Sequence, residues 1–177
     1  MQGYGISMTA PQYNVFDLGP QHLEQVLAIN NANAPAVGEL NCNELKYLVE
    51  HALYALIITD LHEIDVQAFC LTFAPGVPYT SPNYRWFSDC YDDFVYLDRI
   101  AVASQYQNKG CGTALYGAVE KYMIIDRTAP LLTCEVNLQP PNCGSLRFHQ
   151  RLGFCEVGQQ ESKPGLVVSL LAKTISH

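Results

Sequence analysis

The stretch from Phe94 to Thr113 constrains the fold of this chain more than any other part of the sequence. It begins with the run Phe94–Val102, which is largely apolar at successive positions and therefore reads as a strand buried on both faces. A loop containing Gly110 and Gly112 follows. A helix is expected from about Gly112, because apolar residues then recur at helical spacing. A buried strand feeding a glycine loop and an amphipathic helix is typical of α/β proteins.

The rest of the 177 residues alternates between strand and helix patterns, and the 49% hydrophobic content can fill one sizeable core. We expect a single domain over residues 1–177 with roughly seven strands and four helices. The expected strands are Asn14–Leu18, Ala52–Thr59, Val66–Phe73, Phe94–Val102, Leu131–Val136, Phe154–Gly158 and Leu166–Lys173. The expected helices contain Leu23–Asn30, Leu45–Ala52, Gly112–Tyr122 and Ser145–Leu152. Residues 74–93, rich in proline, glycine and aromatic residues, are expected to be irregular, either covering a hydrophobic edge or lining a pocket as a lid.

Composition excludes several classes of protein. The formal net charge is −7, which opposes binding to nucleic-acid backbones and suits a cationic amine. No apolar run approaches the ~18 residues that span a bilayer, and Met1–Tyr4 lacks the features of a signal peptide. The seven cysteines form no CxxC pair, so we expect reduced thiols, no structural metal and a cytoplasmic location.

The loop Gln107–Ala114 has the composition of an anion-binding loop. Glycines before a helix let backbone N–H groups close around a phosphate, although an ordinary turn has the same look. A Walker loop is excluded because Lys109 precedes Gly110. A dinucleotide fingerprint is excluded because its third glycine is replaced by Leu115.

Two motifs, roughly 35 residues apart, carry a resemblance to a known family. Gln107-Asn108-Lys109-Gly110-Cys111-Gly112 is similar to the Arg/Gln-x-x-Gly-x-Gly/Ala coenzyme A loop of the GNAT acetyltransferases. Asn142 to Phe154 resembles that family's Asn-x-x-Ala-x-x-x-Tyr-x-x-x-Gly-Phe segment, with Ser145 in the Ala place and His149 in the Tyr place. The resemblance covers residues 94–158 well and the N-terminal half only in element order.

The resemblance implies a GNAT fold: a central, mixed but mostly antiparallel sheet in which the fourth and fifth strands splay apart to admit acetyl-CoA. Residues 94–158 would bind the coenzyme and residues 13–93 would form the acceptor side. The residues implied to bind coenzyme are Ile100, Ala101 and Val102 on the strand, Gln107, Asn108, Lys109, Gly110, Cys111, Gly112 and Thr113 in the loop, and Asn142 and Ser145 at the second motif. Asn142 has a second reading as a plain helix cap.

The implied reaction is acetyl transfer from a thioester to an amine of a small molecule or a peptide. Only about one lysine-like amine in 2,500 is neutral at pH 7, a deficit of ~4.6 kcal/mol, so a base would help. Asp98, which shares a face with Ile100 and Val102 if the strand is regular, and Glu135 on the adjacent strand are the candidate bases. Ion pairing with Arg99 or Arg147 and a water chain are the competing readings. His149 is the candidate donor to the departing sulfur, or a packing histidine.

Two further classes remain open at this stage. A non-catalytic acyl-CoA sensor would bind coenzyme without turnover, and a nucleotide-binding oxidoreductase would bind dinucleotide instead. Residues 30–39 and the aromatic stretch 79–91 would suit either the acceptor or a homodimer interface.

Overall fold

The computed structural model describes residues 13–60 and 64–176. The prediction that the chain has no signal peptide rests on Met1–Tyr4, and these residues lie outside the described ones. The elements, in chain order, are β1 (Val15–Asp17), the 3₁₀ helix η1 (Pro20–His22), α1 (Leu23–Ala32), α2 (Cys42–His51), β2 (Tyr54–Thr59), β3 (Val66–Phe73), α3 (Pro82–Cys90), β4 (Val95–Val102), the 3₁₀ helix η2 (Ser104–Tyr106), α4 (Cys111–Asp126), β5 (Leu131–Gln139), α5 (Cys143–Arg151), β6 (Cys155–Lys163) and β7 (Leu166–Thr174).

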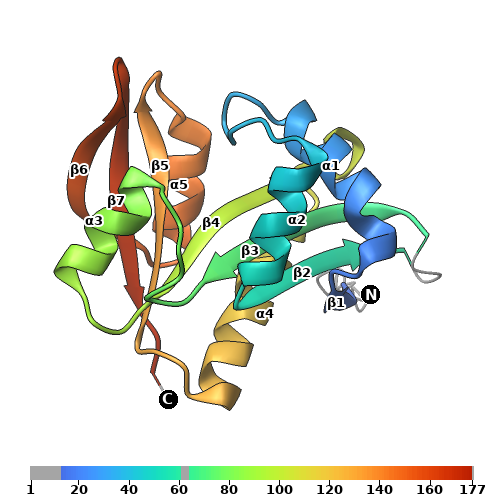
Figure 1. Cartoon of the computed structure of the whole chain (residues 1–177), viewed down its shortest axis with the longest axis horizontal. Coiled ribbons are helices and arrows are strands. Elements are labelled where there is room, and N and C mark those ends of the chain that lie inside the picture. Colours follow the sequence, from blue (N-terminus) through green and yellow to red (C-terminus); the bar gives the residue numbers. More distant parts are fainter. Residues whose placement is uncertain (1–12, 61–63, 177) are drawn as a thin grey trace, which may run out of the picture.

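The seven strands form one sheet in the order β1-β2-β3-β4-β5-β7-β6. Every neighbouring pair is antiparallel except β4 and β5, which are parallel. The β4–β5 pairing consists of Val95 with Leu132 and Tyr96 with Thr133, and beyond these residues the two strands separate (Figure 1). The expected mixed sheet with a splay between the fourth and fifth strands is confirmed.

Helices cover both faces of this sheet, and each face has its own hydrophobic core. Residues of α1, α2 and α3 pack with Phe69, Phe73 and Tyr96 on one face. Residues of α4 and α5 pack with Leu97 and Leu132 on the other. In Figure 1, α1 and α2 lie in front of the central strands and α4 lies behind them. The gap between β4 and β5 therefore lies between two faces of the sheet that are covered by different helices and have separate hydrophobic cores. Among the described residues, no helix has both the length and the apolar character needed to cross a bilayer.

The stretch 74–93 differs from expectation, because it contains the nine-residue helix α3. Ser81 caps this helix by accepting a hydrogen bond from the Tyr84 N–H, and Pro82 occupies its first turn. Tyr84 and Phe87 are buried in the core beside Phe94. The aromatic residues thus belong largely to a helix that packs on the sheet, and the described part of the chain contains five α-helices rather than four.

Candidate active site

A cavity of about 820 Å³ lies at the splay between β4 and β5. Six of the residues selected from the sequence line it: Asp98, Ile100, Glu135, Asn142, Ser145 and His149. Residues 34–39 and 79–83, together with the β6–β7 hairpin, form its outer wall. The cavity therefore reaches from the α1–α2 side of the sheet to the α4–α5 side.

Strand β4 is not regular at Asp98. Leu71 of β3 pairs with Arg99 and Thr72 pairs with Leu97, so Asp98 is the extra residue of a β-bulge. Leu97 and Ile100 both belong to the α4 face, whereas Asp98 bonds to Tyr79, which belongs to the opposite core. The expectation that Asp98 shares a face with Ile100 and Val102 is wrong, because the bulge interrupts the two-residue period.

Asp98 is held by two hydrogen bonds. The Tyr79 hydroxyl donates to Oδ1 at 2.6 Å, and Arg99 Nε donates to Oδ2 at 2.7 Å. The pair with Arg99 is a salt bridge whose side chains are 5% and 9% exposed for Asp98 and Arg99. The ion pair anticipated as the competing reading of Asp98 is present.

Glu135 lies on β5 and accepts a 2.8 Å hydrogen bond from the Tyr96 hydroxyl at Oε2. Burial and, to a smaller extent, the neighbouring charge of Asp98 raise the pKa of Glu135 from 4.5 to about 7, against the lowering effect of Tyr96, Asn83 and Arg99. A carboxyl with this pKa exchanges protons readily at neutral pH, which is the property required of a general base.

His149 on α5 is 4% exposed, and both of its ring nitrogens have protein partners. Nδ1 lies 2.7 Å from the Ser145 carbonyl oxygen, which can only accept, so Nδ1 carries the hydrogen. Nε2 then accepts a 2.7 Å hydrogen bond from the Tyr116 hydroxyl. Burial lowers the pKa of His149, in keeping with a neutral ring. A direct contact between His149 and the coenzyme sulfur stays a prediction.

The glycine loop lies outside this cavity, at the start of α4. Asn108 and Gly110 have positive φ angles of 59° and 99°, and Gly110 precedes the 16-residue helix. Within residues 13–60 and 64–176, no side chain caps this end, whereas α2, α3 and α5 are capped by Asn41, Ser81 and Asn142, respectively. Uncapped N–H groups at the positive end of a long helix fit an anionic pyrophosphate.

The two glycines of the loop have different roles. Any residue with a Cβ would strain the backbone at position 110, because L residues seldom adopt a φ of 99°. A Cβ on Gly112 would lie 3.2 Å from the Phe148 ring, so this glycine allows α4 to approach α5 closely. The Cys111 side chain is buried, and Lys109 Nζ lies 5.4 Å from the Tyr106 ring centroid.

Other predicted coenzyme contacts already have protein partners. The Val102 carbonyl accepts hydrogen bonds from Asn33 Nδ2 at 3.2 Å and Gln107 Nε2 at 3.3 Å. Asn142 caps α5 by accepting from the Ser145 N–H at 3.1 Å, so its reading as a helix cap is correct. The Ala101 side chain is buried. Coenzyme contacts of these residues and of Thr113 stay predictions.

Several lining residues were missed as site residues in the sequence. Tyr116 and Cys134 line the cavity but look like core positions in the sequence. Tyr96 does not line the cavity, but it donates a hydrogen bond to Glu135, and in the sequence it looks like one more apolar strand residue. The only signal for Arg99 was its position beside Asp98. The cavity exists because β4 and β5 separate, and no local sequence pattern predicts where two strands separate.

The comparisons with known proteins agree with this geometry. The sequence profile of the acetyltransferase (GNAT) family matches residues 79–154, which include β4, the glycine loop and α5. The resemblance to GNAT acetyltransferases that the two motifs carry is therefore confirmed over these residues. Curated proteins give no match to the sequence.

Several solved structures share the fold of this chain. The ribosomal-protein-S18-alanine N-acetyltransferase of Escherichia coli is 19% identical, with a TM-score of 0.69, covering 94% of this chain and 96% of its own. Ard1 from Thermoplasma volcanium is 14% identical, with a TM-score of 0.74, covering 93% and 99%. NAA60 of Arabidopsis thaliana, in complex with acetyl-CoA, is 17% identical, with a TM-score of 0.71, covering 93% and 100%.

Within the described residues, Cys134 is the one cysteine whose side chain lines the cavity. Burial raises its pKa strongly, which keeps the sulfur protonated and a poor nucleophile. In the described ranges, no group of three or more His, Cys, Asp or Glu side chains is placed to hold a metal ion.

Proposed function

We propose that this protein transfers the acetyl group of acetyl-CoA directly to a primary amine, and that the acceptor is the α-amino group of a peptide. The family match supports acetyl-CoA as the donor. The cavity supports direct transfer, because it connects the two sides of the sheet at the splay. The raised pKa of Cys134 argues against an acetyl-cysteine intermediate.

The observation that carries this proposal is the buried Glu135, which we assign as the general base. An α-amino group has a pKa of about 7.7–8.0, roughly one unit above that of Glu135, so moving its proton costs about 1.4 kcal/mol. A lysine amine would cost about 4.6 kcal/mol. Asp98 is the weaker candidate, because Tyr79 and Arg99 already occupy one lone pair on each of its oxygens.

The coenzyme would enter from the α4–α5 side. The free N–H groups at the start of α4 would hold the pyrophosphate. The β4 backbone around Ile100 and Val102, which lies beyond the last residue paired with β5, would hold the pantetheine arm. Asn142 and Ser145 line the cavity and would contact the arm at the start of α5. The thioester would then lie at the splay, with His149 on one side and Glu135 on the other.

In the reaction, Glu135 takes a proton from the ammonium group of the acceptor. The neutral nitrogen attacks the thioester carbonyl, the C–N bond forms and the C–S bond breaks. The coenzyme leaves as a thiolate, the attacking nitrogen loses its remaining extra proton, and the thiolate gains one. The products are the N-acetyl peptide and free coenzyme A, and Glu135 releases the proton it took to solvent. His149 and Tyr116, which are hydrogen-bonded to each other and line the cavity, would be the polar pair beside the departing sulfur.

The acceptor wall also fits an extended peptide. Residues 34–38 are small or apolar, and their neighbours across the cavity include Ser162 and Lys163 of the β6–β7 hairpin. The relative from Escherichia coli is named for acetylating the alanine of a ribosomal protein. Charges in the lining are mixed, which favours one amine over a polycation.

The experiment is a titration with acetyl-CoA followed by an amine panel. The panel contains an alanine-initiated tetrapeptide, its Nα-blocked counterpart with a free lysine, and a small polyamine. We expect coenzyme binding, and turnover fastest on the free α-amine. Binding without turnover of any amine would instead indicate an acyl-CoA sensor. The oxidoreductase alternative lacks support, given the acetyltransferase family match.

A further inference from the structure

The segment 34–39 forms part of the acceptor wall and has no regular secondary structure of its own. It follows α1 and contains Gly38, which has open space where a Cβ would be. Such a segment holds a fixed position only if its backbone groups are tied to something rigid. The structure ties it to β4 at two points.

The first tie is at its beginning. Asn33 Nδ2 donates to the Val102 carbonyl at 3.2 Å, and Gln107 Nε2 approaches Asn33 Oδ1 at 3.4 Å. The second tie is at its far end, where the Gly38 carbonyl accepts from Asn30 Nδ2 at 2.9 Å and from Arg99 Nη1 at 3.3 Å.

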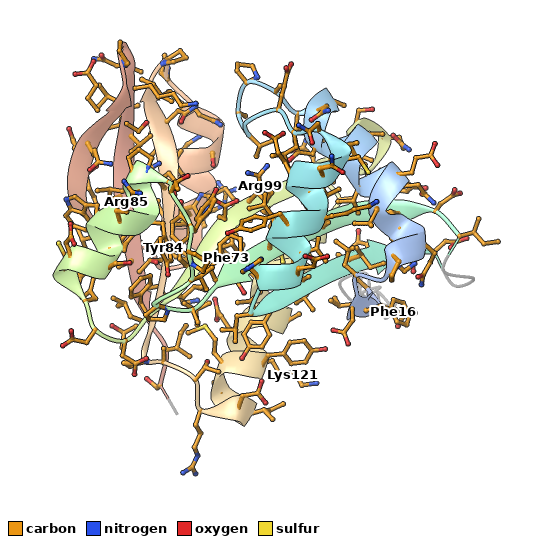
Figure 2. The ribbon with its side chains drawn as sticks, viewed as in Figure 1. Phe16, Phe73, Tyr84, Arg85, Arg99 and Lys121 are labelled. Atoms are coloured by element: carbon orange, nitrogen blue, oxygen red, sulfur yellow. The ribbon has the colours of Figure 1, made fainter. Side chains whose placement is uncertain are left out.

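Arg99 is the centre of the second tie. Its side chain comes from the β4 bulge and lies near the middle of the molecule (Figure 2). The residue is 8% exposed, and Nη1 also donates to Asn30 Oδ1 at 2.9 Å while Nε binds Asp98. Asp98 in turn accepts from Tyr79, which lines the opposite part of the wall. One guanidinium thus links α1, the 34–39 segment, the bulge and residue 79.

This arrangement requires arginine rather than positive charge alone. A buried ion pair is stable only when its hydrogen-bonding groups are satisfied, and a planar guanidinium can donate in several fixed directions at once. A lysine is a single point charge that could pair with Asp98 but not reach Asn30 and Gly38 in the same geometry.

We propose that Arg99 is a positioning residue for the acceptor: it fixes residues 34–39 against the β4 bulge, and thereby sets where the acceptor backbone lies relative to Glu135. The proposal rests on the proposed function, because it assumes that the acceptor enters between residues 34–39 and 79–83. It assigns Arg99 no contact with the reacting atoms.

The first test measures backbone hydrogen exchange and needs no activity. In Arg99→Gln we expect amides 36–40 to exchange at least tenfold faster than in the wild type, with α4 amides unchanged. Arg85→Gln, at the exposed arginine of α3 labelled in Figure 2, is the matched control and should leave both regions unchanged. Unaltered exchange at 36–40 in Arg99→Gln would overturn the proposal.

A second variant guards against misfolding of Arg99→Gln. Asn30→Asp keeps the oxygen that Arg99 bonds but removes the Nδ2 donor to Gly38. We expect faster exchange of the same amides, by a smaller factor. Wild-type exchange there would contradict a tie at Gly38.

The second test is kinetic, with the alanine-initiated tetrapeptide at saturating acetyl-CoA and about pH 9, where Glu135 is ionised. Arg99→Gln and Arg99→Lys should both raise KM for the peptide about tenfold or more, change kcat less than threefold, and leave coenzyme affinity unaltered. A wild-type KM in Arg99→Lys would show that charge alone suffices and would overturn the positioning role. Absence of transfer by the wild type would contradict the proposed function, while the exchange result would still test the tie.

Discussion

At the scale of single residues, the buried carboxyl of Glu135 is the proposed general base, and its ionisation lowers the stability of the fold. Glu135→Gln keeps the Tyr96 hydrogen bond but cannot take a proton, so kcat/KM for the tetrapeptide should fall about 100- to 10,000-fold at pH 7. The loss should shrink above about pH 9, where the amine loses its own proton. A pH profile of both enzymes measures this, and an equal loss at every pH would contradict the role of base.

The same substitution should stabilise the fold at alkaline pH. Because the pKa of Glu135 is raised from 4.5 to about 7, the unfolded chain releases the proton first, and the wild type loses stability as pH rises between those values. Glu135→Gln does not titrate, so its advantage in denaturant unfolding should grow by up to about 3 kcal/mol from pH 4 to pH 8. Glu50→Gln, at an exposed position of α2, is the control and should show no such growth.

Asp98 should affect catalysis through Glu135. Its charge raises the pKa of Glu135, so Asp98→Asn should move the acid limb of kcat/KM to lower pH by roughly half to one unit. We expect less than a tenfold loss at the plateau. A loss of 100-fold near neutrality that disappears by about pH 10, with the limb unmoved, would make Asp98 the base instead.

His149 and Tyr116 share one hydrogen bond, so substitutions of either residue should lower the rate by a similar factor. His149→Ala should lower kcat about 10- to 100-fold and leave coenzyme affinity unchanged, because a thiolate is a good leaving group that needs little help. Tyr116→Phe removes only the hydroxyl and should cost a similar factor; His149→Tyr should restore part of the rate. Wild-type turnover in His149→Ala would identify a packing residue.

At the scale of elements, the sequence allowed the strands, the glycine loop and the helix α4 to be predicted, because these depend on local periodicity and turn chemistry. The bulge at Asp98 was not predicted, because Phe94–Val102 contains no glycine or proline to mark it and the charged pair Asp98-Arg99 is also compatible with a regular strand. Helix α3 was missed because prolines and glycines at 75, 76, 78 and 82 look like a loop, yet Pro82 is a favoured first-turn residue. As a result, Asp98 lies on the opposite face of the sheet from the expected one, and Tyr79 lies in the segment just before α3.

Substitutions at Gly110 and Gly112 can distinguish the effect of the glycine loop on coenzyme binding from the effect of the α4–α5 contact on stability. Gly110→Ala places a Cβ at a φ of 99° beside the expected pyrophosphate, so it should weaken acetyl-CoA binding at least tenfold and cost about 1 kcal/mol of stability. Gly112→Ala pushes on Phe148 and should lower the melting temperature, with less effect on affinity. Calorimetry and thermal unfolding of both variants measure the two effects. Equal loss of affinity in both would mean that Gly112 also borders the coenzyme.

At the scale of the whole molecule, the sheet divides two tasks between its faces. The face with α4 and α5 presents an uncapped helix end suited to an anion, while the carboxylates of Asp98 and Glu135, which in the proposed function meet the amine, line the cavity at the splay. The two faces meet only where β4 and β5 separate, so the parallel pairing of Val95–Tyr96 with Leu132–Thr133 sets how far the splay extends. The chemistry requires this division, because a polyanionic donor and a cationic acceptor must reach one point from different directions.

The net charge of −7 should make the acceptor step sensitive to salt in a way that depends on the peptide. Long-range attraction raises the encounter rate of a cationic acceptor, and screening removes it as the Debye length shortens from about 20 Å to about 6 Å between roughly 20 and 300 mM salt. For an alanine-initiated tetrapeptide that carries one lysine, kcat/KM should fall about threefold to tenfold over this range. A matched tetrapeptide with glutamate in place of the lysine should lose little or gain, because its own carboxylates are repelled at low salt. If both peptides respond alike, the acceptor is captured by short-range contacts in the cavity and the charge of the molecule has no part in selecting it.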